Sequence, residues 1–539
     1  MAPDAPKSHA EQQQPAGWLS RSYPLLFALY PLLFLYSKNL VNVYFPLELT
    51  IVLCTSVIAL IVLLYLVLRD LDKGALIATL LILWFFRGLM VSQFFSDYVP
   101  SFSIPFIREY SWPFMVSASV LCVCLWIART RVNLRTLNSA LNIFAIVLMG
   151  LVSFDLISAF SVKSEVNERA ISNVEALGIP ELKVGDDAPH ILYIVLDTRA
   201  NTNVLRELYG YDDTAFNDSL KKMGFTIDPY ARTNYGTTAQ ILPAMLNMSY
   251  FKMPEDITVV ARRYDYLIQE MQNSRTLKAI KNGGYYYRHI TSGYKATNFA
   301  PLADEVLTLS DRPLIDEFVG NLLGRSMLRV ITPKVVDHEW FRAHIRFSLD
   351  EIEKLEEPDQ PMFVFAHVMS PHMPFVLDKN GDAVDPRTVT YDKGLWSLKD
   401  LYIEQLAYTD QRILEGIESV ISRFKRPVAV VLMSDHGSHL TWSDTNGFDG
   451  EEMAIERMFI LNALRLPGAD APPADMTPVN TFRFLFDQYF DTDLGMLEDR
   501  SIRSYHVYAH HPDEFNHTDI TEFLKNTKWV PSEFPSATK

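Results

Sequence analysis

Three apolar runs in the second half of the chain end in side chains that bind metal ions or transfer protons. The runs span 190–197, 361–372 and 428–437 and are rich in Val, Ile and Phe. Uniformly apolar runs of this length are typical of strands buried on both faces of a parallel sheet. Ligands of such sheets bind outside the carboxyl ends of the strands. The side chains that should meet at this edge are Asp197, His372, Asp435 and His436. This arrangement indicates a metal-dependent hydrolase or group transferase.

The candidate metal ligands are Asp197, Asp435 and His436. Carboxylate oxygen and imidazole nitrogen suit a divalent ion such as Zn²⁺, Mn²⁺ or Mg²⁺, and the pattern allows one or two ions. An isolated Asp-His-Gly can also be a turn with a buried polar pair. Because this one follows an apolar run, as Asp197 follows another, a metal site is the favoured interpretation.

A hydroxyl held at the metal would be the nucleophile. Residues 232–247 supply Thr237 and Thr238 after Gly236, which permits a tight turn, and before an apolar stretch that suits an inward-facing helix. Either threonine could instead be only the N-cap of that helix. Taken alone, the segment favours this capping role.

The first 160 residues are far more apolar than the rest and predict about five membrane spans. A charge-free run of some twenty residues matches the ~30 Å hydrocarbon core of a bilayer. The predicted spans are 49–68, 74–95, 111–128 and 137–154, with an earlier one at about 22–44 that prolines and Lys38 interrupt. The protein is therefore expected to be an integral membrane protein with several spans.

The positive charges of the short loops predict which side holds the second half. Most lie on one side of the five spans, which should be cytoplasmic. The catalytic half is then extracytoplasmic, and periplasmic in a bacterial inner membrane. Arg87 falls inside a span, and we expect it to reach Asp155 or a lipid phosphate, either as a substrate contact or as a structural salt bridge.

Strand-like runs alternate with helix-like stretches such as 340–355 and 401–424, which predicts an α/β domain with a helix-covered, mostly parallel sheet. The predicted organisation has five parts. They are a disordered cytoplasmic start at 1–17, a membrane domain at 18–161, a linker or surface helix at 162–188, a catalytic domain at 189–500 and a tail at 501–539.

Composition excludes some classes of function. A formal net charge of -15, with no basic stripe, argues against a nucleic-acid partner. The cysteines are Cys54, Cys122 and Cys124, all in the apolar half. The catalytic half can therefore contain neither an internal disulfide nor a cysteine-derived nucleophile.

From about residue 189 to 500 the chain resembles the sulfatase-like branch of the alkaline phosphatase superfamily. It is most similar to membrane-anchored phosphoethanolamine and phosphoglycerol transferases, including lipoteichoic acid synthases. The matching positions are Asp197 after the first strand, Thr238 five residues before Pro243, the pair Asp435 and His436 after a late strand, His367 and His372 five residues apart, and the segment 477–483.

The resemblance implies a role for each matching residue. Thr238 would be the nucleophile and a metal ligand beside Asp197, Asp435 and His436, whereas Thr237 does not fit the spacing. His367 and His372 would bind the phosphoryl group, and His372 could also protonate the leaving group. A core histidine is an equal alternative for His367, which lies within an apolar run.

The sequence also departs from these families. The lipid A transferases carry a further histidine twelve residues after the Asp-His pair, where this chain has Phe448; nearby His439 is interpreted as an exposed loop residue. Thr198 stands where sulfatases usually place a second acid, and the Cys/Ser-x-Pro-x-Arg motif of formylglycine sulfatases is absent around Thr238.

The predicted function is transfer of a phosphoethanolamine or phosphoglycerol group from a membrane lipid to an envelope glycan or glycolipid, through a phosphothreonine at Thr238. Alternatives are a phosphatase, phosphodiesterase or sulfuric ester hydrolase of the same fold, and a non-catalytic envelope-assembly protein. Because the expected ligands are all present, an enzyme is favoured over the non-catalytic alternative.

Overall fold

The chain forms two compact units in a computed structural model. The structure describes residues 21–39, 45–98, 105–251, 253–254, 256–257, 260–309, 317–330, 335–385, 394–441, 450–503 and 518–527. The first unit comprises Met1–Ser161 with Ile315–Pro333, and the second comprises Val162–Leu314 with Lys334–Lys539. The predicted start at 1–17, Phe448 and most of the tail lie outside the described residues.

The first unit consists of long apolar helices. They are α1 (Tyr23–Lys38), α2 (Leu47–Leu68), α3 (Leu71–Tyr98), α4 (Pro105–Arg129) and the first part of α5 (Arg135–Ala176). Four helices among the described residues are long and apolar enough to cross a membrane, and they correspond to the last four predicted spans. The remaining predicted span coincides with α1, which has only 16 residues and contains Pro31. A total of five spans therefore stays a prediction.

The ion pair expected between Arg87 and Asp155 is not the one in the structure. Asp155 Oδ2 lies 3.0 Å from Lys38 Nζ, which links α5 to the end of α1. Arg87 lies on α3 with an exposed side chain. The lysine that interrupts the earliest apolar run thus supplies the counter-charge for Asp155, and a lipid phosphate remains the predicted partner of Arg87.

A segment from the middle of the catalytic sequence belongs to the first unit. Residues Ile315–Pro333 were expected within the catalytic domain at 189–500, but α11 (Glu317–Gly324) and the 3₁₀ turn Met327–Val330 pack with the apolar helices. Phe318 and Leu322 join the buried cluster formed by α1, α2, α3 and α5. Burial of these apolar side chains is the physical reason for the different boundary.

Gly88 provides the space on α3 into which Met327 fits. A β-carbon at Gly88 would lie 2.9 Å from Met327 Sδ and 3.2 Å from Trp84 Cδ1, which is closer than such atoms pack. Gly88→Leu should therefore displace Met327 and destabilise the first unit by about 1–3 kcal/mol, the usual cost of overpacking. Thermal unfolding of the purified protein in detergent would measure this loss. The control is Gly150→Leu on α5, because nothing lies within 4 Å of that position; equal unfolding temperatures for the two variants would contradict the prediction.

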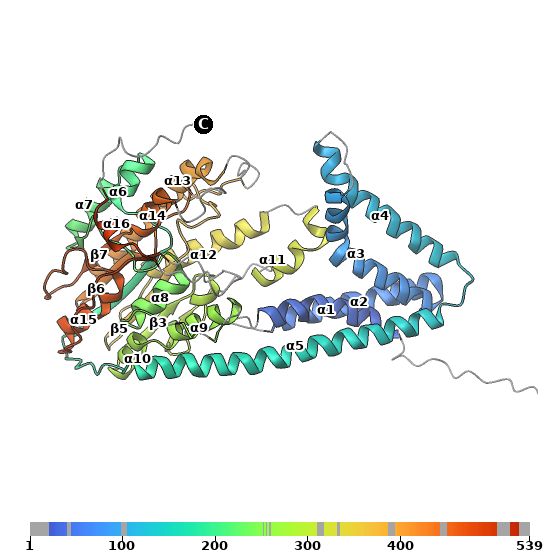
Figure 1. The fold of residues 1–539 in the computed structure, drawn as a ribbon, viewed down its shortest axis with the longest axis horizontal. Helices are drawn as coiled ribbons and strands as arrows, with labels where there is room; N and C mark the ends of the chain where they lie inside the picture. The colour runs from blue at the N-terminus through green and yellow to red at the C-terminus, as the bar shows by residue number, and fades with distance from the viewer. Residues whose placement is uncertain are drawn as a thin grey trace, which may run out of the picture. The chain divides into compact units, whose positions relative to one another are not determined.

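Helix α5 continues through the predicted linker. It is one helix of 42 residues that ends at Ala176, and Figure 1 shows it uninterrupted. Its last part packs within the second unit, where Val166 and Ala170 share a buried cluster with Tyr266. Of the two interpretations of 162–188, the surface helix therefore describes the portion up to Ala176, and only the remainder is a non-helical connection.

The second unit contains a seven-stranded sheet in the order β2-β7-β6-β1-β5-β3-β4. Strands β6, β1, β5, β3 and β4 are parallel, whereas β7 is antiparallel to both β6 and β2. The strands are β1 (His190–Leu196), β2 (Thr226–Ile227), β3 (Tyr286–Ile290), β4 (Glu305–Leu307), β5 (Met362–Val368), β6 (Val428–Ser434) and β7 (Asn462–Arg465). Every residue of β1, β5 and β6 is buried, as the three apolar runs predicted.

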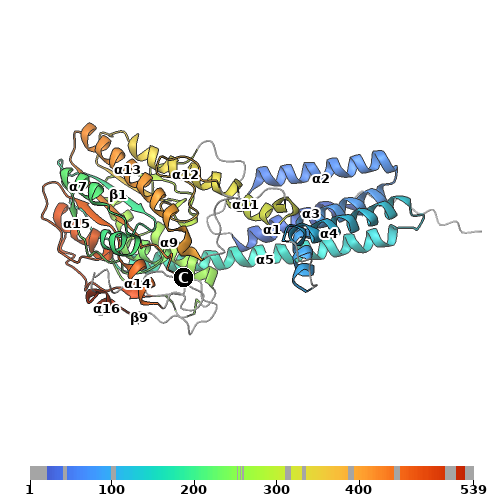
Figure 2. The same cartoon turned by 90° about the horizontal axis from the view of Figure 1, so that it is seen from above.

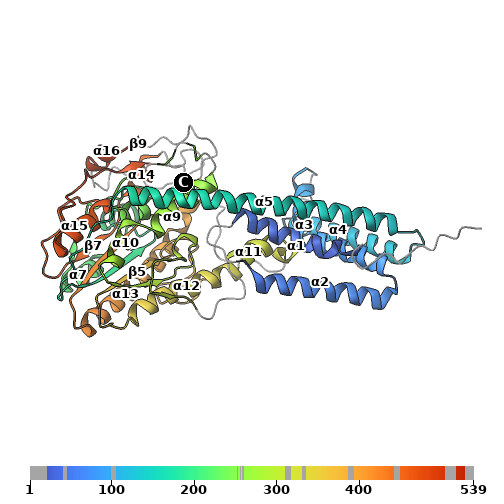
Figure 3. The ribbon, with the colours of Figure 1, turned by 90° about the horizontal axis from the view of Figure 1, so that it is seen from below.

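Helices cover both faces of this sheet, which confirms the predicted fold class. Apolar residues of α7 (Thr214–Lys222), α12 (Val335–Glu353) and α13 (Lys399–Arg423) pack on one face, and Figure 2 shows α12 beside α13. On the other face, the Tyr193 ring of β1 contacts Phe482 of α15 (Thr481–Tyr489), and its hydroxyl lies 3.0 Å from Met245 Sδ of α8 (Thr238–Leu246). Helices α9 (Val260–Gln272) and α10 (Arg275–Asn282) adjoin α8, and Figure 3 labels them near α15.

The beginning of the predicted tail is part of the second unit. Strand β8 (Ile502–Arg503) pairs with β9 (Thr518–Asp519), and α16 (Thr521–Lys525) follows. The Ile502 amide donates a hydrogen bond of 2.8 Å to the Asn234 carbonyl, just before the threonine segment. These residues help to hold the loop that leads to Thr238.

Candidate metal centre and nucleophile

Two aspartates follow neighbouring strands at the same level. Leu196, the last residue of β1, is paired with Ser434, the last residue of β6. The next residues along the chain are Asp197 and Asp435, and both are almost fully buried. The parallel register of the strands therefore brings together carboxylates that are far apart in the sequence.

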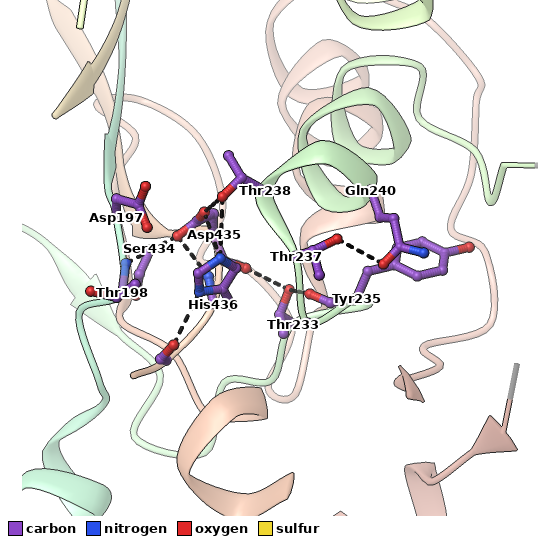
Figure 4. A network of polar contacts seen from close by, with 12 residues as sticks. Asp197, Thr198, Thr233, Tyr235, Thr237, Thr238, Gln240, Ser434, Asp435 and His436 are labelled. Carbon is purple, nitrogen blue, oxygen red and sulfur yellow. Dashed lines mark hydrogen bonds and ion pairs between the residues drawn. The ribbon is translucent and has the colours of Figure 1, made fainter. Parts of the chain in front are cut away.

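Thr238 is the first residue of α8 and its hydroxyl faces this pair (Figure 4). Thr238 Oγ1 donates a hydrogen bond of 2.6 Å to Asp435 Oδ2 and lies 3.2 Å from His436 Nε2. The neighbouring hydroxyl of Thr237 points elsewhere and donates to Gln240 Oε1 at 2.8 Å. Of the two candidate nucleophiles, the structure thus brings only Thr238 into contact with the predicted metal ligands.

The hydrogen bonds of His436 assign its tautomer. Its Nδ1 lies 3.0 Å from the Gly437 carbonyl, which can only accept, so Nδ1 must carry the proton. In the neutral ring Nε2 then presents its lone pair toward Thr238. Burial, followed by the charge of Arg457, lowers the pKa of His436 well below its usual value and keeps the ring neutral. A neutral imidazole whose Nε2 lies 3.2 Å from Asp435 Oδ2 is suited to metal coordination.

His367 lies beside Asp197 and completes a group that could hold an ion. Each of Asp197, His367 and Asp435 offers a ligand atom within 4.8 Å of the other two. His367 Nε2 is 3.5 Å from Asp197 Oδ2, yet this nitrogen and Asp197 Oδ1 are buried without a hydrogen-bond partner. Unpaired buried polar atoms are costly. A divalent cation among these atoms would satisfy them, so the residues present fit a metal ion.

Residues on the Nδ1 side of the ring fix the orientation of His367. Its Nδ1 lies 3.0 Å from Thr297 Oγ1, and the Tyr294 ring packs against the imidazole edge-on. Thr297 Oγ1 lies 2.7 Å from Ser292 Oγ, so the hydroxyl proton of Thr297 can be donated there. Thr297 can then accept from Nδ1–H, which leaves Nε2 as a ligand atom. Sequence reasoning missed Thr297, because a threonine in a loop after a strand carries no distinctive signal.

The two buried carboxylates differ in their acidity. Burial, followed by the charge of Asp197, raises the pKa of Asp435 to about 6. Burial acts in the same direction on Asp197, but the charge of His372, followed by the hydrogen bond and charge of His367, outweighs it and lowers the pKa of Asp197. Asp197 is therefore the carboxylate that stays ionised, and Asp435 is the one that can hold a proton.

Thr198 is held in a strained backbone conformation beside the two acids. Its φ is 65°, in the left-handed region that β-branched residues rarely adopt. In this conformation the Thr198 amide donates to Asp435 Oδ1 at 3.2 Å, and its carbonyl accepts from Tyr402 at 3.0 Å. The position at which sulfatases usually carry a second acid thus supplies a backbone donor here.

The two remaining histidines of the site lie together. The rings of His372 and His439 have centroids 6.2 Å apart, and His439 Nδ1 is 3.2 Å from Arg457 Nη1. The interpretation of His439 as an exposed loop residue is therefore wrong. Burial, with the charges of Arg457 and His372, lowers the pKa of His439 to about 3. Its loop is fixed by buried Glu456, which accepts hydrogen bonds from Ser438 Oγ and the amides of Leu440 and Thr441.

Arg457 belongs to the site, although nothing in the sequence indicated it. It lies near the end of α14 (Glu451–Met458), and its Nε donates to the Gly236 carbonyl at 2.7 Å. Its Nη1 donates to the Gly437 carbonyl at 3.1 Å, and its Nη2 lies 3.1 Å from His436 Nε2. The glycine of the Asp-His-Gly sequence is needed here, because a β-carbon at Gly437 would lie 2.0 Å from the Glu456 carbonyl oxygen.

These features define an α/β protein whose parallel sheet gathers two acids, imidazoles and one hydroxyl at its carboxyl edge. Residues 189–460 match the family model described as Sulfatase. The chain belongs to the sulfatase family, in agreement with the resemblance found in its sequence.

Several solved structures are similar at low sequence identity. One is the C-terminal periplasmic domain of EcEptC from Escherichia coli in complex with Zn, with 14% identity, a TM-score of 0.40, and coverage of 63% of this chain and 98% of that chain. Another is the integral membrane protein lipooligosaccharide phosphoethanolamine transferase A from Neisseria meningitidis, with 14% identity, a TM-score of 0.35, and coverage of 88% and 96%. The curated proteins include no match.

The raised pKa of Asp435 predicts how metal affinity depends on pH. Below about pH 6 the metal-free protein carries a proton on Asp435, and an ion must displace it to bind. Asp197 and His436 do not compete, because their lowered pKa values leave ligand atoms free of protons. The affinity should therefore fall about tenfold per pH unit below pH 6 and be nearly constant above it.

Competition with a chelator, measured between about pH 5 and 8, would determine this dependence. The matched control is Asp435→Asn, which should bind the ion more weakly and lose the pH dependence. Affinity of the unmodified protein that did not change across this range would contradict the assignment of the titrating ligand.

Proposed function

We propose that this protein is a membrane-bound, metal-dependent transferase. It moves a phosphoryl-linked head group, phosphoethanolamine or phosphoglycerol, from a lipid donor to an envelope glycan or glycolipid on the extracytoplasmic side. The observation that carries the proposal is the hydrogen bond of 2.6 Å from the Thr238 hydroxyl to Asp435 Oδ2. It gives the nucleophile a hydrogen-bond acceptor at the positive end of α8, where negative charge is favoured. The four apolar helices favour a substrate from the membrane.

In the first half-reaction Thr238 attacks the phosphorus of the lipid phosphodiester. The Thr238 Oγ–P bond forms, the bond from phosphorus to the lipid oxygen breaks, and the hydroxyl proton of Thr238 is released to solvent. The departing lipid oxygen takes a proton from His372. The His372 Nδ1–H donates to the Met373 carbonyl at 2.5 Å, so Nε2 is the nitrogen that can exchange a proton with substrate.

In the second half-reaction an acceptor hydroxyl attacks the phosphothreonine. The bond from phosphorus to the acceptor oxygen forms and the Oγ–P bond breaks. The acceptor's proton returns to His372 Nε2, and Thr238 takes up a proton from solvent. His372 and Thr238 end as they began, so the cycle is balanced in protons. If water replaced the glycan hydroxyl, the same steps would make the protein a phosphodiesterase.

Asp197, Asp435, His436 and the Thr238 hydroxyl would hold a divalent ion, with His367 as a ligand or a phosphoryl contact. Such an ion supplies positive charge that favours the ionised hydroxyl and stabilises charge developing on the phosphoryl oxygens. Arg87 remains a proposed contact for a lipid phosphate.

The two adjacent threonines provide the sharpest test. After incubation with phosphatidylethanolamine or phosphatidylglycerol vesicles, mass spectrometry of the purified protein should find the head-group increment on Thr238. Thr238→Ala should lose the adduct and reduce transfer on the order of 10³-fold or more, because the nucleophile is gone.

Thr237→Ala is the matched control. Its hydroxyl contacts Gln240 rather than the acids, so adduct formation should persist with a loss of at most about 1 kcal/mol in stability. The proposed mechanism would be excluded if Thr238→Ala kept full activity and the protein with its natural Thr238 formed no adduct. A correctly folded protein that binds no metal under varied supply would instead favour the non-catalytic alternative.

A further inference from the structure

The Arg457 side chain joins the loop before the nucleophile to the loop that carries the metal ligand. It donates to the carbonyls of Gly236 and Gly437 at 2.7 and 3.1 Å. It also lies close to two imidazole nitrogens, at 3.1 Å from His436 and 3.2 Å from His439. One guanidinium therefore contacts the turn that precedes Thr238 and both histidines that follow Asp435.

This pattern differs from that of an arginine with a purely structural role. Arg483 donates to three backbone carbonyls, and Arg465 donates to the carbonyls of Met223 and Val428. Arg457 also donates to two backbone carbonyls, but in addition it contacts the imidazole nitrogens of His436 and His439. A guanidinium is the group best suited to bind two oxygens of a phosphoryl group.

The contact with His436 changes when the site is loaded. The Nε2 lone pair of His436 can either accept the Arg457 hydrogen bond or coordinate a cation, but it cannot do both. The Thr238 hydroxyl lies 3.2 Å from the same nitrogen, so an Arg457 N–H that gives up this acceptor lies next to the proposed nucleophile. A phosphoryl oxygen on Thr238 is the negatively charged acceptor that this position would meet.

We propose that Arg457 is a catalytic residue that binds the non-bridging oxygens of the phosphoryl group on Thr238. Its guanidinium provides positive charge beside His436 and His439. This inference rests on the proposed function, which supplies the phosphoryl group.

The test uses the full-length protein in detergent, loaded with metal, and inorganic phosphate as the probe. Phosphate affinity is measured by equilibrium dialysis, metal content by elemental analysis, and folding by thermal unfolding. Arg457→Met should keep the metal content of the unmodified chain and bind phosphate at least about tenfold more weakly, and Arg457→Lys should retain part of the affinity.

Arg465→Met is the matched control, because Arg465 also binds backbone carbonyls but at the opposite end of β6. It should leave phosphate affinity unchanged. If Arg457→Met does not fold, Arg457→Lys carries the test, since lysine keeps the charge but cannot form a paired contact with two oxygens. Unchanged phosphate affinity in a folded Arg457 variant would overturn the inference.

The result can be separated from that of the proposed function. If phosphate binding depends on Arg457 but Thr238 never acquires a head group, the proposed function fails and the role of Arg457 in anion binding stands. If Thr238 acquires the head group but phosphate affinity is unchanged in the Arg457 variants, the proposed function stands and this inference fails.

Discussion

The close approach of two buried carboxylates is the constraint on which the second unit depends. Asp197 and Asp435 have ligand atoms within 4.8 Å of each other, and at this separation two like charges repel by about 3 kcal/mol at an effective dielectric constant of 20. The surrounding groups stabilise this negative charge. The amides of Thr198 and His436 donate to Asp435, and the N-terminus of α8 faces it through Thr238. A metal ion and the guanidinium of Arg457 would supply the positive charge that offsets the rest of the repulsion.

Much of this site could be predicted because its residues are next to strand ends. The apolar runs identify β1, β5 and β6, and parallel pairing is enough to bring Asp197 and Asp435 together. The choice of Thr238 over Thr237 required the family spacing, because both threonines have the same local environment in the sequence. The structure separates them by the direction of their hydroxyls.

Other parts of the site could not be predicted, for reasons that are physical. Arg457 and Thr297 reach the centre only through tertiary contacts, across gaps that no local period describes. His439 lies in the site because buried Glu456 fixes its loop. The segment 315–333 lies within the predicted catalytic domain but packs with the first unit, because its apolar residues, too few to form a span, fill space against α1 and α3.

The nucleophile helix α8 is also anchored at the end away from the site. Asn247 caps the C-terminal end of α8, where its Nδ2 donates to the Glu270 carbonyl on α9 and its Oδ1 accepts from the Arg275 amide on α10. Glu270 in turn accepts a hydrogen bond from Asn173 on α5. The anchoring contacts of α8 therefore lead to the last turns of the long helix that begins among the apolar spans. Since α8 has only nine residues, fixing Asn247 also helps to position Thr238 about two and a half turns away.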